Sequence, residues 1–206
     1  MAALRILWWA GGRFQADLVP DAGAPGPGGA RLVGVRGQPG RDAARSAIRV
    51  ALAADLQAWS GLDPARIELR GDAGEAPYAL LDHGTHVQRV ALAISHDGDI
   101  SVAALRPHGT VGIDVMAVAD VADWEAVARD YLGHSVASAL AVLAPDARAS
   151  AFARAWSERE ARLKCRGLAL SEWDADGDAV LAACPCWPLG LPDGYVGALA
   201  LPLPIE

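Results

Sequence analysis

Lysine is almost absent from this chain: of its 18 basic residues, 17 are arginines and only Lys164 is a lysine. A composition rich in alanine, glycine and arginine indicates a GC-rich genome, in which arginine replaces lysine wherever either cation serves. Arginine carries a planar, fork-shaped charge, whereas the lysine ammonium is a compact point charge. A lysine that persists against this background is therefore a candidate for a position that a guanidinium cannot fill.

Cysteines and long hydrophobic runs are also scarce. The three cysteines, Cys165, Cys184 and Cys186, cannot all pair, and we expect no secretory leader or membrane span, because the apolar run at 4–10 is short and contains a charge. These features predict a cytoplasmic, reducing setting. A metal site at Cys184-Pro185-Cys186 is the alternative to buried thiols, but no second pair or neighbouring histidine completes it, so buried thiols are favoured.

Positive charge is in deficit as well, with a net charge of −7 and a pI near 5.2. Nucleic acid is therefore excluded as an expected partner, because phosphate binding needs clustered cations. Apolar residues make up 52% of the chain and charged residues 21%, which is enough apolar surface for a real core. A length of 206 residues fits one large domain or two small ones.

The pattern along the chain predicts an α+β protein. One helix is expected from Asp42, as its N-cap, to Gly61, a second stretch over 120–143 with a break near Gly133, and a third from Pro145 to the C-cap Gly167. Expected strands are 4–9, 31–36, 67–70, 90–95, 100–105, 111–116, 179–184, a piece near Trp187, and 195–201. Asp-Gly between 90–95 and 100–105 indicates a hairpin.

This order of elements, helix and strands followed again by helix and strands, suggests two similar lobes. We place them at residues 1–105 and 106–206, although no residue-level repeat relates them. Active sites often lie between lobes, so the chemistry-bearing residues are expected there.

The neighbours of Lys164 suggest a role for it. Glu160 lies four residues earlier and Trp156 one further turn back, so all three share a helix face. A surface ion pair between Glu160 and Lys164, worth a few tenths of a kcal/mol, is the simplest alternative. Asp114, however, lies within the apolar strand 111–116, where an unpaired carboxylate would be costly.

Other polar residues are expected close to Asp114. Ser95 and His96 end the apolar strand 90–95 at the hairpin. With Asp97, the carboxylates Asp114 and Glu160 form an oxygen-rich set suited to Mg²⁺, which prefers carboxylates, waters and substrate phosphates.

Together these motifs resemble the 4'-phosphopantetheinyl transferases, specifically their longer, two-lobed type. That family carries a Gly-x-Asp strand, then a Trp-x-x-Lys-Glu-x-x-x-Lys helix followed by Gly, with an upstream Ser-His element. The matching residues here are Gly112-Ile113-Asp114, then Trp156, Glu160, Lys164 and Gly167, with Ser95-His96 upstream and a similar closing strand at 194–200. The resemblance extends over about residues 41–201.

The resemblance implies that the phosphopantetheine arm of coenzyme A is transferred to a serine of an apo acyl or peptidyl carrier protein, with Mg²⁺ as the cofactor. Adenosine 3',5'-bisphosphate would be released. Asp114 and Glu160 would hold the metal, and Lys164 a phosphate oxygen. Ser95 and His96 would contact the coenzyme A phosphates, while Arg45, with Arg41 as the alternative, would take the 3'-phosphate. Glu160, directly or through a metal-bound water, would be the base for the carrier serine.

Several residues depart from the family pattern. Met116 stands where bacterial prototypes carry Glu, so the third metal ligand could be Asp97, which is equally well explained as a turn former. Glu75, in Gly74-Glu75-Ala76-Pro77, replaces a lysine that helps seat the adenine, and Arg159 replaces a Lys. A catalytically weakened relative that only binds a carrier or nucleotide is therefore the second hypothesis. A third, an unrelated metal-dependent hydrolase, lacks a positive motif. We expect a monomer, because one chain holds both lobes.

Overall fold

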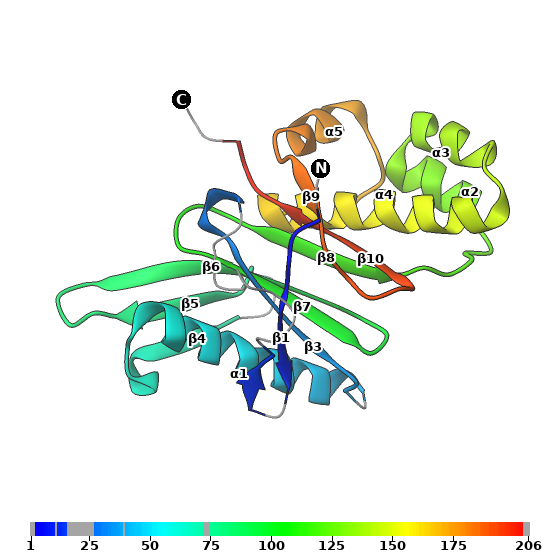
Figure 1. The fold of residues 1–206 in the computed structure, drawn as a ribbon. Helices are drawn as coiled ribbons and strands as arrows, with labels where there is room; N and C mark the ends of the chain where they lie inside the picture. The colour runs from blue at the N-terminus through cyan, green and yellow to red at the C-terminus, as the bar shows by residue number, and fades with distance from the viewer. Residues whose placement is uncertain (1–2, 11, 16–26, 39, 72–74, 204–206) are drawn as a thin grey trace.

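The computed structural model describes residues 3–10, 12–15, 27–38, 40–71 and 75–203. The described residues form five α-helices and two β-sheets (Figure 1). This confirms the predicted α+β class. Gly74, the first residue of the Gly74-Glu75-Ala76-Pro77 segment, lies outside the described residues.

The larger sheet has seven strands and belongs mainly to the first half of the chain. Its order is β2 (Arg13–Phe14), β1 (Leu7–Ala10), β3 (Arg31–Arg36), β7 (Ile100–Arg106), β6 (Val87–Asp97), β5 (Tyr78–Asp82) and β4 (Ile67–Arg70). Strands β6 and β7 pair antiparallel around Gly98, whose φ is 56°. The Asp-Gly hairpin is therefore confirmed. No separate sequence signal marks β5, which the structure places between β4 and β6.

The smaller sheet contains the strand of Asp114. Its order is β8 (Gly112–Ala117), β10 (Tyr195–Ala200) and β9 (Cys186–Pro188), all antiparallel, with Asp114 opposite Ala198. Three of the predicted strands, at 111–116, near Trp187 and at 195–201, are thus found close to their expected bounds.

Two long helices cover the outer faces of the two sheets. Helix α1 (Arg41–Ser60) buries Ile48, Leu52 and Leu56 against the larger sheet. Its N-cap is Gly40 rather than Asp42, because Asp42 already lies in the first turn and makes no capping hydrogen bond. Helix α4 (Pro145–Arg166) ends at Gly167 in the left-handed conformation, as predicted.

The predicted helical stretch over 120–143 is divided into shorter pieces. These are α2 (Trp124–Val127), a π-helical turn η3 (Ala128–Leu132) and α3 (His134–Ala141). The break falls at Gly133, as expected, with φ of 89°, and a Cβ atom there would overlap the ring of Trp173. Short 3₁₀ turns occur at Pro27–Gly29 (η1) and Pro64–Arg66 (η2).

The prediction of a strand at 179–184 is wrong. These residues fall largely in helix α5 (Ala175–Ala182). Asp174 caps the helix by accepting a 2.7 Å hydrogen bond from the backbone N–H of Gly177. A short apolar run fits a strand and a buried helix equally well by periodicity, so the cap was the decisive signal.

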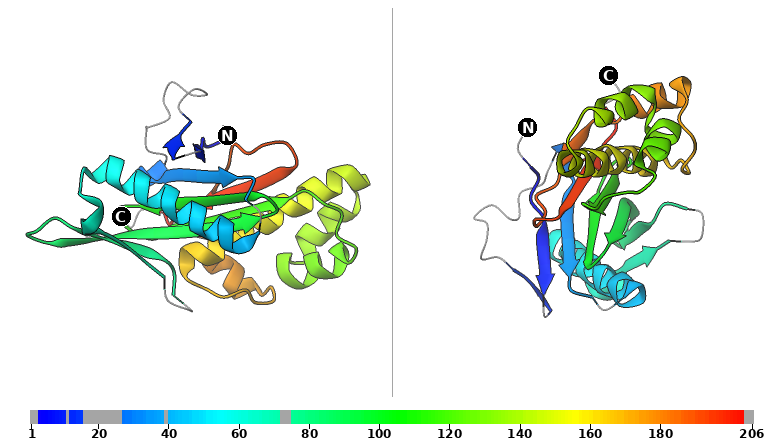
Figure 2. Two further views of the ribbon diagram at one scale, coloured as in Figure 1. Left: turned by 90° about the horizontal axis from the view of Figure 1, so that it is seen from below. Right: turned by 90° about the vertical axis from the view of Figure 1, so that its right-hand side faces the viewer.

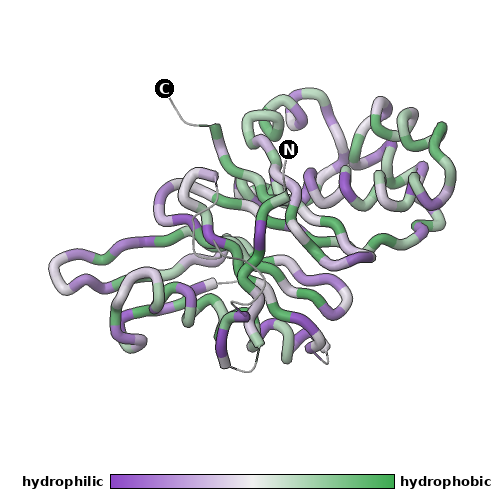
Figure 3. The backbone as a smooth tube through the Cα atoms, in the orientation of Figure 1, coloured by the Kyte–Doolittle hydropathy of each residue, from purple (hydrophilic) through white to green (hydrophobic). Residues whose placement is uncertain are grey.

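The elements stack as α1, the seven-stranded sheet, the three-stranded sheet and α4, with α2, α3 and α5 beside α4 (Figures 1 and 2). Hydrophobic residues concentrate on the strands in the middle of the molecule (Figure 3). The core between the sheets joins Ile100 and Val102 of β7 to Ile113 of β8 and Leu199 of β10. Within the described residues, no helix has both the length and the apolar character needed to cross a membrane.

Candidate active site

The site begins with the close contact between helix α4 and strand β8. Gly112 allows this contact, because a Cβ atom there would overlap the carbonyl oxygen of Ala161 and the backbone nitrogen of Cys165. The α4 backbone therefore lies almost directly on the strand. Asp114, two residues further along β8, faces the same side of the strand as Gly112. The glycine thus brings Asp114 next to the α4 residues that flank Ala161.

Lys164 pairs with Asp114 across this contact. Its Nζ lies 2.7 Å from Asp114 Oδ1 and 3.2 Å from the carbonyl oxygen of Ile113. The described structure contains no ion pair between Lys164 and Glu160, so the surface-pair alternative is not what the fold uses. The single lysine instead joins α4 to β8 and compensates a buried carboxylate.

Ser95 completes the environment of Asp114 from the larger sheet. Its hydroxyl donates a 2.7 Å hydrogen bond to Asp114 Oδ1 and accepts one of 3.2 Å from the backbone N–H of Val115. Burial raises the pKa of Asp114 above its ordinary value, while the Lys164 charge and the Ser95 hydrogen bond oppose that rise. In this structure Ser95 therefore orients Asp114, a contact that the sequence did not predict.

Glu160 lies near Asp114 without a cationic partner. Among the described residues its carboxylate makes no hydrogen bond and no ion pair. Partial burial raises the pKa of Glu160 first, and repulsion from the Asp114 carboxylate raises it further, whereas Lys164 acts in the opposite direction. The side chain is thus a carboxylate whose proton affinity is increased by its surroundings.

These side chains line one pocket of about 400 Å³, which we call the carboxylate pocket. Its polar members are Ser95, His96, Asp97, Asp114, Glu160 and Lys164, and its apolar members include Met116 and Trp156. The fold therefore brings together six of the eight residues that the sequence nominated. They come from β6, β8 and α4, elements that are far apart in the chain.

Asp97 reaches this pocket but has structural partners of its own. Its Oδ2 accepts a 2.7 Å hydrogen bond from the backbone N–H of Ala117, and its Oδ1 accepts one of 2.9 Å from Gly98. These contacts fasten the β6–β7 hairpin to the end of β8. The described residues contain no group of three or more His, Cys, Asp or Glu side chains that could hold a metal, so Asp97 as a third ligand stays a prediction.

The remaining donor set fits a hard divalent cation with few protein ligands. The Glu160 carboxylate has no hydrogen-bond partner among the described residues, and it repels the Asp114 carboxylate in the same pocket. A cation that keeps several waters and binds substrate phosphates, as Mg²⁺ does, needs only one or two carboxylates from the protein. Asp114 and Glu160 are the two carboxylates that would supply these ligands.

The other two nominated residues, Arg41 and Arg45, line a neighbouring pocket of about 350 Å³, which we call the arginine pocket. Ser95 and His96 border both pockets. The structure adds Arg49, from the same helix, to this pocket. Three guanidinium groups beside an imidazole suit an anionic group such as a phosphate.

Glu75 lines the same arginine pocket. Its carboxylate carries charge of the same sign as a phosphate ligand, so it opposes the attraction of the guanidinium groups. Pro77, from the same segment, is also part of the wall. Glu75, which departs from the family pattern, thus lies within the site and not elsewhere on the surface.

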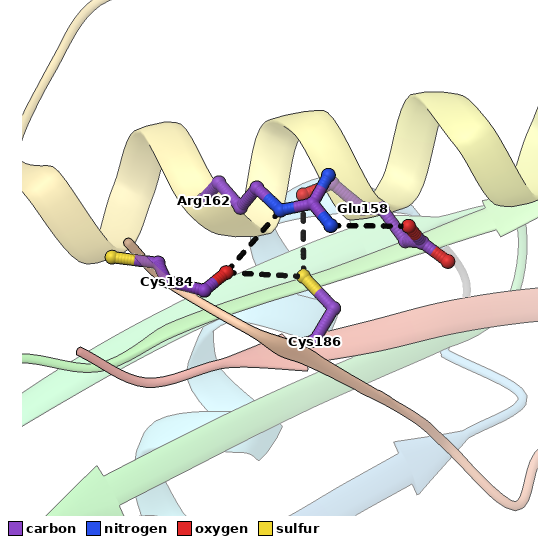
Figure 4. A network of polar contacts seen from close by, with 4 residues as sticks. All are labelled: Glu158, Arg162, Cys184 and Cys186. Atoms are coloured by element: carbon purple, nitrogen blue, oxygen red, sulfur yellow. Dashed lines mark hydrogen bonds and ion pairs between the residues drawn. The ribbon is translucent and has the colours of Figure 1, made fainter. Parts of the chain in front are cut away.

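Cys184 and Cys186 form a separate polar network with Glu158 and Arg162 of α4 (Figure 4), whereas Cys165 is a residue of α4 itself. All three are free, and Cys186 Sγ lies 3.6 Å from the carbonyl oxygen of Glu158, whose carboxylate pairs with Arg162. Burial raises the pKa of Cys165 to about 12 and that of Cys186 to about 11. The thiols of Cys165 and Cys186 are therefore protonated packing groups, which agrees with the favoured interpretation.

Comparison with protein families gives one match: residues 110–182 fit the model of the 4'-phosphopantetheinyl transferase superfamily. The matched segment begins just before β8 and ends with α5, so it contains Asp114, Glu160 and Lys164. A search of curated proteins finds no match. This match over part of the chain, together with the α4–β8 geometry described above, supports the 4'-phosphopantetheinyl transferase superfamily, which the motifs of the chain resemble.

Proposed function

We propose that this protein transfers the 4'-phosphopantetheine arm of coenzyme A to a serine of an apo acyl or peptidyl carrier protein, with Mg²⁺ as its cofactor. The observation that carries the proposal is the Lys164–Asp114 pair beside the unpaired Glu160, in a pocket that adjoins the arginine pocket. One pocket provides carboxylates and a cation for a pyrophosphate, and the other provides guanidinium groups for a further phosphate.

The two pockets bind different phosphates of coenzyme A. Arg45 and Arg41 bind the 3'-phosphate from α1, and His96 lies between the pockets, where it can contact the phosphates of either. Lys164 offers a point charge to a pyrophosphate oxygen while it remains next to Asp114. Such positioning and charge compensation account for most of the catalysis in phosphoryl transfer.

Asp114 and Glu160 are the residues that would hold Mg²⁺, with Asp97 as the proposed third ligand. The cation would neutralise charge that develops on the pyrophosphate. Ser95 and Lys164 fix Asp114 through its Oδ1.

Glu160 is the proposed base for the carrier serine. The serine oxygen forms a bond to the β-phosphorus of coenzyme A, the bond from that phosphorus to the bridging oxygen breaks, and adenosine 3',5'-bisphosphate leaves. The serine proton passes to Glu160, directly or through a water. The raised proton affinity of this carboxylate, caused by burial and by Asp114, favours that transfer.

The test is the mass of the carrier after incubation of the protein with Mg²⁺, coenzyme A and each of several apo carriers. We expect a gain equal to one phosphopantetheine arm. Glu160→Gln and Asp114→Asn should slow this gain by about 10²- to 10⁴-fold. Glu158→Gln is the matched control, because Glu158 lies on the same helix and pairs with Arg162. No gain on any carrier, or full rates in both site variants, would refute the proposal.

A second candidate is a weakened relative that binds a carrier or nucleotide without transfer. Met116 in the carboxylate pocket and Glu75 in the arginine pocket favour it. The two candidates separate in the same assay, since this one predicts coenzyme A binding by calorimetry without a mass gain. We further propose two lobes at 1–105 and 106–206, a monomer, and a reducing, cytoplasmic setting suited to three free thiols.

A further inference from the structure

A buried serine contacts the imidazole that lies between the two pockets. Ser101 on β7 stands directly opposite His96 on β6, and its Oγ lies 2.8 Å from His96 Nδ1. Ser101 is only 1% exposed, so its hydroxyl has no access to bulk water. His96 Nε2, in contrast, has no hydrogen-bond partner among the described residues. One nitrogen of the ring is therefore engaged by the protein, and the other is left for a ligand.

The hydroxyl hydrogen of Ser101 decides which nitrogen carries the imidazole proton. Within the described part of the chain, His96 Nδ1 is the one hydrogen-bond partner of Ser101 Oγ. If Nδ1 carried a proton, Ser101 would accept it, and its own hydrogen would be buried without an acceptor, which is costly. If Ser101 donates to Nδ1 instead, the hydroxyl hydrogen is satisfied and the proton of the neutral ring must lie on Nε2.

We propose that Ser101 is a positioning residue that holds His96 as an Nε2–H donor aimed at a phosphate of coenzyme A. The inference rests on the proposed function for the identity of the ligand, but not for the state of the ring. An Nε2 lone pair would repel a phosphate oxygen, whereas an Nε2–H donates to it. Ser101 thus fixes the tautomer of His96, so that Nε2–H acts as the donor.

A donor at His96 Nε2 also suits the charged side chains around the imidazole ring. Arg41, Arg45, Arg49 and Glu75 lie in the pocket on one side, and Asp97, Asp114, Glu160 and Lys164 in the pocket on the other. Each of the two pockets therefore already contains both cationic and carboxylate side chains. An N–H at Nε2 adds direction to phosphate recognition between these two sets of charges.

The state of the ring can be measured without substrate. Long-range proton–nitrogen correlation spectra of the full chain labelled with ¹⁵N-histidine distinguish the two tautomers. The chain has five histidines, so a His96→Gln variant assigns the signals. We expect the Nε2–H form in the wild type, a mixture of tautomers in Ser101→Ala, and the Nε2–H form again in Ser101→Thr, which keeps the hydroxyl.

Kinetics give the second measurement. We expect Ser101→Ala to raise the KM for coenzyme A by about five- to tenfold with a much smaller change in kcat, as for one lost hydrogen bond in binding. Ser101→Thr should restore the KM. Ser157→Ala is the matched control, because Ser157 is equally buried but its hydroxyl has no partner among the described residues.

An Nδ1–H tautomer in the wild type, or a Ser101→Ala spectrum identical to it, would overturn the inference. So would a KM unchanged in Ser101→Ala. If the wild type modified no carrier, the proposed function would fail, but the spectra of the free protein would still decide the state of His96. The two failures are therefore distinguishable.

Discussion

Lys164 illustrates at the scale of one residue why an arginine-rich chain keeps a lysine. Its ammonium donates to the carbonyl oxygen of Ile113 and to Asp114 Oδ1 from the gap between α4 and β8. The ammonium makes both contacts as a compact point charge, whereas the charge of a planar guanidinium is spread over a larger group. The composition identified this residue, and the structure supplies the reason.

Replacing Lys164 with Met should destabilise the protein in a pH-dependent way. Burial already raises the pKa of Asp114, and without Lys164 it rises further. A carboxyl group with a higher pKa in the folded than in the unfolded state binds protons more tightly when folded, so stability falls as pH rises through that interval. We expect a small cost at acidic pH and roughly 1–3 kcal/mol at neutral pH.

Urea unfolding of the wild type and Lys164→Met across this pH range measures the effect. The double variant Asp114→Asn, Lys164→Met serves as control, because it removes the carboxyl group whose ionisation causes the pH dependence. A cost that is equal at all pH values, or one that persists unchanged in the double variant, would contradict this account of the pair.

At the scale of elements, the packing of α4 on β8 assembles the carboxylate pocket. Both ends of α4 were predictable, because Pro145 and Gly167 are strong local signals for a helix start and stop. Helix α5 was not, since a short apolar run has no decisive period. Gly112 belongs to the Gly-x-Asp motif that indicates the family resemblance. Only the packed structure shows that the absence of a Cβ atom at Gly112 allows α4 to lie so close to β8.

Gly112→Ala should therefore damage both stability and activity. The new Cβ would meet backbone atoms of Ala161 and Cys165, which cannot rotate away, so α4 must move from β8. We expect a loss of about 1–3 kcal/mol or more in unfolding free energy. Because Glu160 and Lys164 move with the helix, the transfer rate should fall by about 10²-fold.

Thermal unfolding and the carrier mass assay measure these two effects. Gly71→Ala is a control for stability, because a Cβ there meets only Pro77 at 3.5 Å, an ordinary contact. A Gly112→Ala protein with wild-type stability and rate would show that the close approach of α4 is not required.

At the scale of the whole molecule, the two halves of the chain share one core. Ile100 and Val102 of the larger sheet pack in the same cluster as Ile113 and Leu199 of the smaller one. Ser95 and Asp97 add polar links from β6 to β8. The halves therefore have no interface that could open without exposing buried apolar residues.

We expect the protein to unfold in one cooperative transition. Calorimetry should give a single peak with equal calorimetric and van't Hoff enthalpies. Residues 106–206 expressed alone should not show a cooperative transition, because their β8–β10 sheet would expose Ile113 and Leu199. Two separate transitions in the full chain would mean that the lobes fold independently.

The sequence by itself determined the α+β class, the ends of α4, the β6–β7 hairpin and the family resemblance, because caps, turns and motif spacing are local properties of the chain. It also nominated Asp114, Glu160 and Lys164, since an acid in an apolar strand and a lone lysine are unusual wherever they occur. Only the tertiary structure decided that Lys164 pairs with Asp114 and not with Glu160, that Ser95 serves Asp114, and that Ser101 contacts His96. These pairings depend on how strands and a helix distant in sequence pack against each other, and no local pattern encodes that distance.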